Sequence, residues 1–231
     1  LFTGHIWSTR AKRCTLAPIC SDKLCSEATY YRMQRREAGM TSSTLAVAGS
    51  ILEQADSFGM SKKKLHKLAY YTQAWSLALR GEPAFPGRIE AWRDGPVAIE
   101  LRNATRNQTC GEVLARTRSQ NLTTEGDLAQ VISLVVAEKD ALSVGELIDQ
   151  THGESPWLNA RGDLKEGESG SQEITHADME RYIFNHGTLF GMTADQLIAL
   201  GYGRPHDPKP PSSTSYEPAT LLDRSANRPF F

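Results

Sequence analysis

The strongest helical pattern in the chain lies between Ser61 and Gly81. Side chains of one face recur there every three or four residues: Leu65, Leu68, Thr72, Trp75 and Leu79. This spacing is typical of an amphipathic α-helix. Ser61 is suited to accept a hydrogen bond from a free N–H of the first turn, and Gly81 to adopt the left-handed conformation after the last turn. The pattern predicts a helix that starts after Ser61 and ends at Arg80.

Shorter helices are predicted on both sides of this segment. A first helix, ended by Phe58-Gly59, has apolar residues on its inner face and a hydroxyl residue as its cap: Leu45, Ala48, Ile51, Leu52 and Ala55 after Ser42, Ser43 or Thr44. Another begins at Thr124 and carries a wide apolar stripe that places it in the core: Leu128, Val131, Ile132, Val135 and Val136. Three more starts follow capping patterns: Ser143 with Glu146, Thr175 with Asp178, and Thr193 with Gln196.

The stretch after the long helix is predicted to be extended. Pro83, Pro86 and Gly87 exclude a helix there. Residues 89–92 then form a short extended segment, Asp94-Gly95 makes a turn, and Pro96 opens a new helix. No element is predicted over the polar residues 103–123. The fold class expected is a mainly α, compact multi-helix single domain with a short β-like extended segment or hairpin around residues 84–92.

The two ends of the chain differ from its middle in composition. Residues 1–39 carry a net charge of +4 and show no sustained period, whereas the remainder carries −5. We therefore expect a non-domain extension over residues 1–39, with Met40 as the natural start, a helical domain over residues 40–202, and a disordered Pro-rich tail over residues 203–231. The mildly acidic body weighs against binding to nucleic acid, which needs a basic surface.

Composition and spacing predict neither a metal nor a cofactor. Three of the four cysteines lie near the start, and Cys14-x5-Cys20-x4-Cys25 lacks the paired spacing of structural zinc sites. The single cysteine of the body, Cys110, fits a reducing cytoplasm. No apolar run is long enough to span a membrane.

No converging set of catalytic groups is found, so no catalytic residue is predicted. His152-Gly153-Glu154 has the H-x-E form of zinc deaminases, but the P-C-x-x-C partner is absent. His152 is expected to hydrogen-bond local backbone instead. A small hydrolase that uses His152 is the least favoured of the three functions considered for this chain.

Several blocks of sequence resemble one family. KLHKLAYYTQAWSLALRGEPAF, IEAWRDGPV and THGESPW stand in the order typical of the Panacea domain of bacterial and phage antitoxins, which includes SocA-type proteins. The resemblance covers roughly residues 42–190. It implies a cytoplasmic antitoxin that neutralises a protein toxin encoded by an adjacent gene, by direct binding or by delivery to a bacterial AAA+ protease. A DNA-binding regulator is the alternative.

The matching positions are predicted to contact the partner or to hold the fold: Tyr70, Tyr71, Trp92, Asp94, Gly95, Pro96, Thr151, His152, Pro156 and Trp157. Tyr70 and Tyr71 are adjacent and point about 100° apart, so they are not both expected on the core seam, and one of them is expected to line a groove or lie near the surface. Trp75 is predicted to be core, and Trp92 either core or the wall of a groove. Residues 62–64 are lysines at the positive end of the long helix, so they are expected to be solvated or to pair with acidic groups.

Overall fold

The computed structural model describes residues 44–55, 59–165 and 167–204. Helices make up 59% of these residues, and the only sheet among them has three short strands, so the predicted mainly α fold class is confirmed. The elements are α2 (Thr44–Gln54), α3 (Lys62–Arg80), β1 (Ile89–Trp92), β2 (Gly95–Ala98), α4 (Ile99–Ala104), α5 (Cys110–Ser119), α6 (Gly126–Lys139), α7 (Val144–His152), α8 (Ser155–Arg161), β3 (Glu173–Ile174), α9 (His176–His186) and α10 (Ala194–Ala199).

Helix α3 is the central element, and both of its predicted ends are confirmed. The Ser61 hydroxyl accepts a hydrogen bond from the Lys64 N–H, and Gly81 has a φ of 68° and donates to the Leu77 carbonyl. Every residue from Leu65 to Leu79 is buried, so α3 is enclosed on all sides rather than along one face. A helix that is buried all round must be surrounded by other elements.

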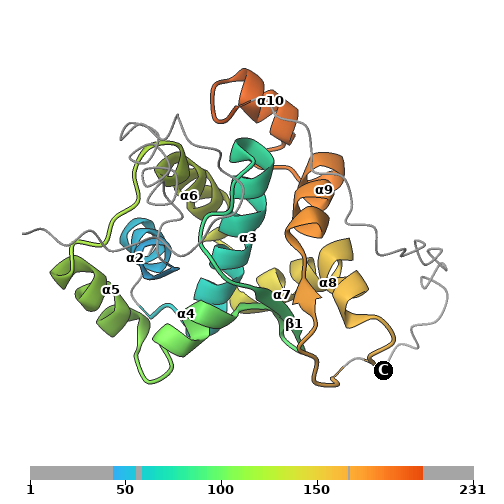
Figure 1. The fold of residues 1–231 in the computed structure, drawn as a ribbon, viewed down its shortest axis with the longest axis horizontal. Coiled ribbons are helices and arrows are strands. Elements are labelled where there is room, and N and C mark those ends of the chain that lie inside the picture. The colour runs from blue at the N-terminus through green and yellow to red at the C-terminus, as the bar shows by residue number, and fades with distance from the viewer. Residues whose placement is uncertain (1–43, 56–58, 166, 205–231) are drawn as a thin grey trace, which may run out of the picture. The chain divides into compact units, whose positions relative to one another are not determined.

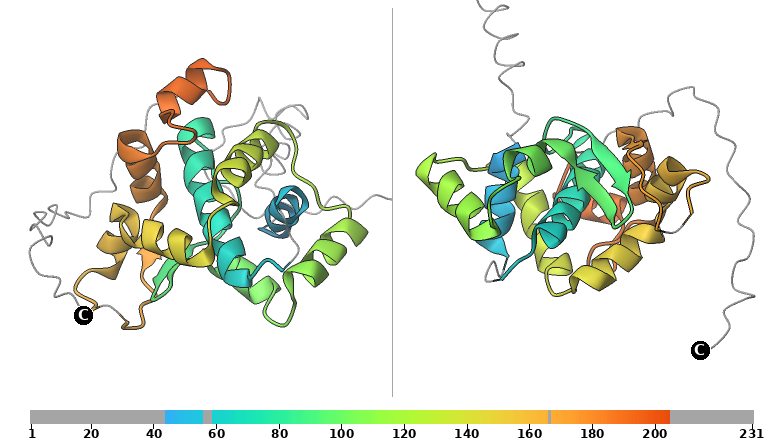
Figure 2. Two further views of the ribbon diagram at one scale, coloured as in Figure 1. Left: turned by 180° about the vertical axis from the view of Figure 1, so that it is seen from behind. Right: turned by 90° about the horizontal axis from the view of Figure 1, so that it is seen from below.

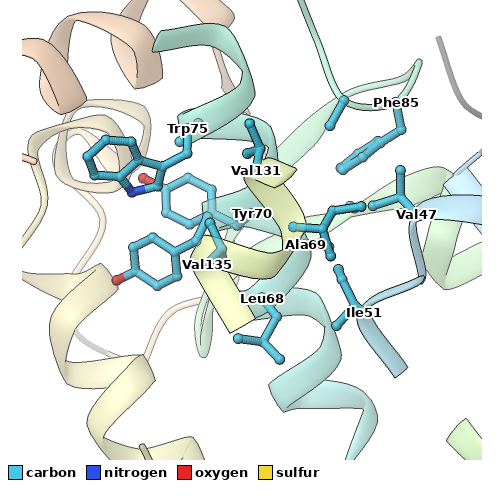
Figure 3. Packing of buried hydrophobic residues seen from close by; sticks show 14 of the residues in the cluster. Val47, Ile51, Leu68, Ala69, Tyr70, Trp75, Phe85, Val131 and Val135 are labelled. Carbon is cyan, nitrogen blue, oxygen red and sulfur yellow. The ribbon is translucent and has the colours of Figure 1, made fainter. Parts of the chain in front are cut away.

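The surrounding helices divide into two groups, as the front and back views show (Figures 1 and 2). Helices α2 and α6 pack on one side of α3, and α7 and α9 pack on the other. The predicted apolar stripe of α6 is buried from Leu128 to Val136. Figure 3 shows Val131 and Val135 of this stripe beside the α3 core residues Tyr70 and Trp75. The core position predicted for Trp75 is confirmed.

The predicted hairpin exists, but one end of it was assigned wrongly. Strand β1 pairs antiparallel with both β2 and β3, in the order β2-β1-β3. Pro96 was predicted to open a helix, whereas it lies in β2 opposite Ala91, and α4 begins only at Ile99. Because β2 is an edge strand, the missing N–H of proline is tolerated there.

Helix starts set by local hydrogen bonds were predicted best. The capping boxes at Ser143 and Thr193 are present, and the Thr175 hydroxyl accepts from the Asp178 N–H. Helix α6 starts at Gly126 rather than Thr124. Helix α5 was not predicted, although Thr109 and Glu112 form a complete capping box at its start.

Some predictions fall on residues that the structure leaves undescribed. These are the extension over residues 1–39, the start at Met40, the cysteine spacing near the start, and most of the tail over residues 203–231. No described helix is both long and apolar enough to cross a membrane.

Candidate functional site: the junction of α3, the hairpin and α7–α8

The ten predicted site residues come together at one junction of the fold. Tyr70 and Tyr71 belong to α3, residues 92–96 form the tip of the hairpin, and the remaining four lie at the end of α7 and the start of α8. Direct contacts join these elements. The Trp157 indole N–H donates to the Trp92 carbonyl at 3.0 Å, and the tyrosines reach the α7–α8 connection.

The centre of the junction is Glu154, a residue that the sequence did not single out for this role. The Tyr70 hydroxyl donates to Glu154 Oε2 at 2.7 Å, and the Tyr71 hydroxyl donates to Oε1 at 2.8 Å. Both tyrosines are buried, Tyr70 being 1% and Tyr71 3% exposed, so neither lies near the surface, but Tyr71 lines a pocket, as was predicted for one of the two. Both are buried because elements cover α3 on every side and one carboxylate accepts from both hydroxyls. Their rings meet edge to face, with centroids 5.2 Å apart.

Burial governs the protonation of this cluster. It raises the pKa of the Glu154 carboxyl, an effect that the two tyrosine hydrogen bonds and the nearby Lys139 oppose. Burial, together with the adjacent carboxylate, also raises the pKa of Tyr70 and of Tyr71 well above the ordinary range. Both tyrosines therefore keep their protons and act as hydrogen-bond donors to Glu154.

A pocket of about 370 Å³ opens beside Glu154. Tyr71, Trp75 and Tyr182 contribute aromatic walls, and Lys139 is among the polar residues that line it. Burial, and to a lesser extent Glu154, raises the pKa of Tyr182 to about 12, so this tyrosine is also neutral at physiological pH.

The hairpin tip closes over a buried lysine. Lys67 of α3 is 2% exposed, and its Nζ donates to the Pro96 carbonyl at 3.2 Å. Gly95 has a φ of 93°, and a Cβ placed there would lie 2.5 Å from Lys67 Nζ and 2.7 Å from Thr151 Oγ1. The position therefore requires glycine for two reasons, its backbone conformation and the close approach of α3 and α7.

We expect Gly95→Ala to destabilise the fold by about 2–5 kcal/mol, because a positive φ costs roughly 1–2 kcal/mol and overpacking roughly 1–3 kcal/mol. Gly191→Ala is the matched control, since Gly191 has a φ of 73° but no atom within 4 Å of its added Cβ. Urea unfolding of both variants separates the steric cost from the backbone cost. Equal losses in the two variants would show that the contact with Lys67 and Thr151 is unimportant.

The exposed side of the hairpin is held by charged side chains. Lys63 pairs with Asp94 at 2.7 Å, so one of the lysines predicted to be solvated or paired has an acidic partner within the chain. Lys64 likewise pairs with Asp140, at 2.9 Å. The hydrogen bonds from Lys63, and also from Arg93, lower the pKa of Asp94.

Two tryptophans, Trp92 and Trp157, belong to the junction. Trp92 is half-buried, donates its indole N–H to Glu90 and lies under the Arg102 guanidinium, which is 4.8 Å from the ring centroid. The imidazole of His152 stacks on Trp157 with centroids 4.0 Å apart and planes inclined by 14°. This stacking places the His152 ring against the ring of Trp157 in α8, a contact that the position of His152 in the sequence did not reveal.

Comparison with known proteins agrees with the resemblance found in the sequence. Residues 65–158 match the family model described as antitoxin SocA-like, Panacea domain. The matched segment runs from α3 into α8 and contains all ten predicted site residues as well as Glu154, but it is shorter than the predicted span of residues 42–190. Neither the curated proteins nor the solved structures include a match to this chain. The match supports an antitoxin role in general.

Among the described residues, no three histidine, cysteine, aspartate or glutamate side chains gather as a metal site would require. The groups that the junction offers are hydroxyls, a buried carboxylate and aromatic faces.

Proposed function

We propose that this chain is an antitoxin that neutralises a protein toxin, encoded by an adjacent gene, by binding it directly. The observation that carries the proposal is the match of residues 65–158 to the antitoxin SocA-like, Panacea domain. Neutralisation by binding needs a rigid body and a complementary surface, and the enclosed helix α3 supplies such a body.

The burial of the matching residues suggests that buried and exposed positions of the domain have different roles. Seven of the ten predicted site residues are buried, and only Trp92, Asp94 and His152 are half-buried. Buried positions preserve packing, whereas exposed positions choose a partner. We therefore propose that the shared motif mainly builds the scaffold and that less buried residues around it select the toxin.

Co-expression tests this function directly. The full chain is produced together with the product of the adjacent gene, growth is scored, and the complex is then sought by co-purification. Rescue of growth with a stable complex is the expected result. Rescue without a complex, accompanied by protease-dependent loss of the toxin, would instead favour delivery to an AAA+ protease. A neighbouring product that is harmless, or a toxin that is not neutralised, would contradict the antitoxin proposal.

A further inference from the structure

Glu154 is a buried carboxylate that has no counter-ion among the residues that the structure describes. It is 6% exposed, and its two oxygens accept hydrogen bonds only from the neutral hydroxyls of Tyr70 and Tyr71. Within the described part of the chain, no lysine, arginine or histidine nitrogen lies within 4.0 Å of it. Buried charges in proteins are normally paired, because an uncompensated charge away from water is costly. A cation placed beside Glu154 would compensate this charge.

The pocket beside Glu154 has walls that suit an organic cation. The faces of aromatic rings attract ammonium and guanidinium groups, and Tyr71, Trp75 and Tyr182 all line this pocket. Its volume of about 370 Å³ is far larger than a single ion needs and lies within the ordinary range of ligand pockets. Asp149, an exposed residue of α7, adds a second carboxylate to the lining of the pocket.

Lys139, at the end of α6, shows how an ammonium lies against one wall. Its Nζ is 5.1 Å from the centroid of the Tyr71 ring and donates to Gln150 Oε1 at 3.3 Å. This ammonium lowers the pKa of Glu154 but forms no ion pair with it. The pocket thus already attracts one cation of the chain while the carboxylate stays unpaired.

We propose that this pocket receives a lysine or arginine side chain of the bound toxin, whose ammonium or guanidinium pairs with Glu154 between the rings of Tyr71 and Tyr182. This inference rests on the proposed function, because it takes the toxin as the source of the cation. It assigns the contact face to the surface between α7 and α9, around the mouth of the pocket.

A small probe tests the pocket without any toxin. Ethylguanidinium is titrated into the full chain and followed by NMR, with propionate as the anionic comparison. Glu154→Gln is expected to weaken the binding of ethylguanidinium at least about tenfold, because a hydrogen bond between charged groups is lost. Glu125→Gln, which removes an exposed carboxylate without a capping bond, is the matched control and should leave binding unchanged.

Three further variants keep this test decisive if Glu154→Gln does not fold. Tyr182→Leu removes an aromatic wall and should weaken the probe about 3- to 10-fold, whereas Tyr182→Phe keeps the ring and the affinity. Lys139→Met removes the competing ammonium and should strengthen ethylguanidinium binding. Absence of ethylguanidinium binding, or propionate binding that Lys139→Met abolishes, would overturn the proposal.

The same variants in the toxin complex test the source of the cation. Glu154→Gln and Tyr182→Leu are expected to weaken the complex at least about tenfold relative to Glu125→Gln and Tyr182→Phe. If these variants lose the binding of ethylguanidinium but bind the toxin normally, the toxin is not the source of the cation, and the proposed antitoxin function is unaffected. If the wild-type chain neutralises no toxin, the proposed function fails, and the toxin as the source fails with it.

Discussion

Glu154→Ala is expected to destabilise the domain by about 2–5 kcal/mol, because it leaves two buried tyrosine hydroxyls without their acceptor. An unsatisfied buried donor costs roughly 1–3 kcal/mol. Tyr70 is fully enclosed, so the full cost applies to its hydroxyl. The hydroxyl of Tyr71 borders the pocket, where a water molecule can replace part of the lost hydrogen bond. The free energy of unfolding in urea at neutral pH measures the loss.

Two companion variants separate the hydrogen bonds from the packing. Glu154→Gln should cost much less, because its amide can accept from one tyrosine hydroxyl and donate to the other. The triple variant Tyr70→Phe, Tyr71→Phe and Glu154→Leu should recover most of the lost stability, since removing both partners of a buried hydrogen bond is nearly neutral. A triple variant as unstable as Glu154→Ala would contradict the account and point to the cavity left by the side chain.

The pH dependence of this site has a definite sign. Burial raises the pKa of Glu154 above its ordinary value of 4.5, so the folded chain holds this proton more tightly than the unfolded chain does. The stability gained from binding this proton is therefore largest below pH 4.5 and is lost as the pH rises through the folded pKa, whereas the tyrosine hydrogen bonds to the carboxylate remain. Glu154→Gln should lack this dependence, because glutamine does not titrate.

Helix ends were predictable from the sequence because they depend on neighbours. Ser61, Ser143 and Thr193 each bond an N–H three residues away, so a short stretch of sequence contains the whole interaction. The strand at Pro96 was not predictable in this way. Its pairing with β1 is part of a sheet that also contains β3, more than seventy residues later in the chain.

Glu154 was missed for a related reason. Its partners lie 83 and 84 residues earlier in the chain, and the periodicity of α3 assigned one of them to a groove or the surface. A signal was present nonetheless, because two adjacent tyrosines in a helix need acceptors when both are buried. The carboxylate of a matching sequence block was the natural candidate. What periodicity could not reveal is that helices and the strand β2 together enclose α3 on every side.

Lys67→Met is expected to remove a rise in stability that the wild-type chain shows above pH 7. Burial is the main cause that lowers the pKa of Lys67 to about 7, with Lys63 lowering it further and Asp94 opposing the shift. Between pH 7 and the ordinary value of 10.5, the unfolded chain therefore binds one more proton than the folded chain at this site. Stability then rises with pH, by up to about 1.4 kcal/mol per pH unit.

The comparison between variant and wild type isolates this lysine. The stability of Lys67→Met relative to wild type should fall by about 2 kcal/mol between pH 7 and pH 9, measured by urea unfolding. Burial raises the pKa of Cys110, which acts in the opposite direction from about pH 9 but is common to both chains. Lys165→Met, which removes an exposed lysine, is the matched control and should follow the wild type. A constant difference across this range would mean that Lys67 keeps its proton beneath the hairpin and that the Pro96 carbonyl, with the charge of Asp94 nearby, is sufficient to hold a buried ammonium.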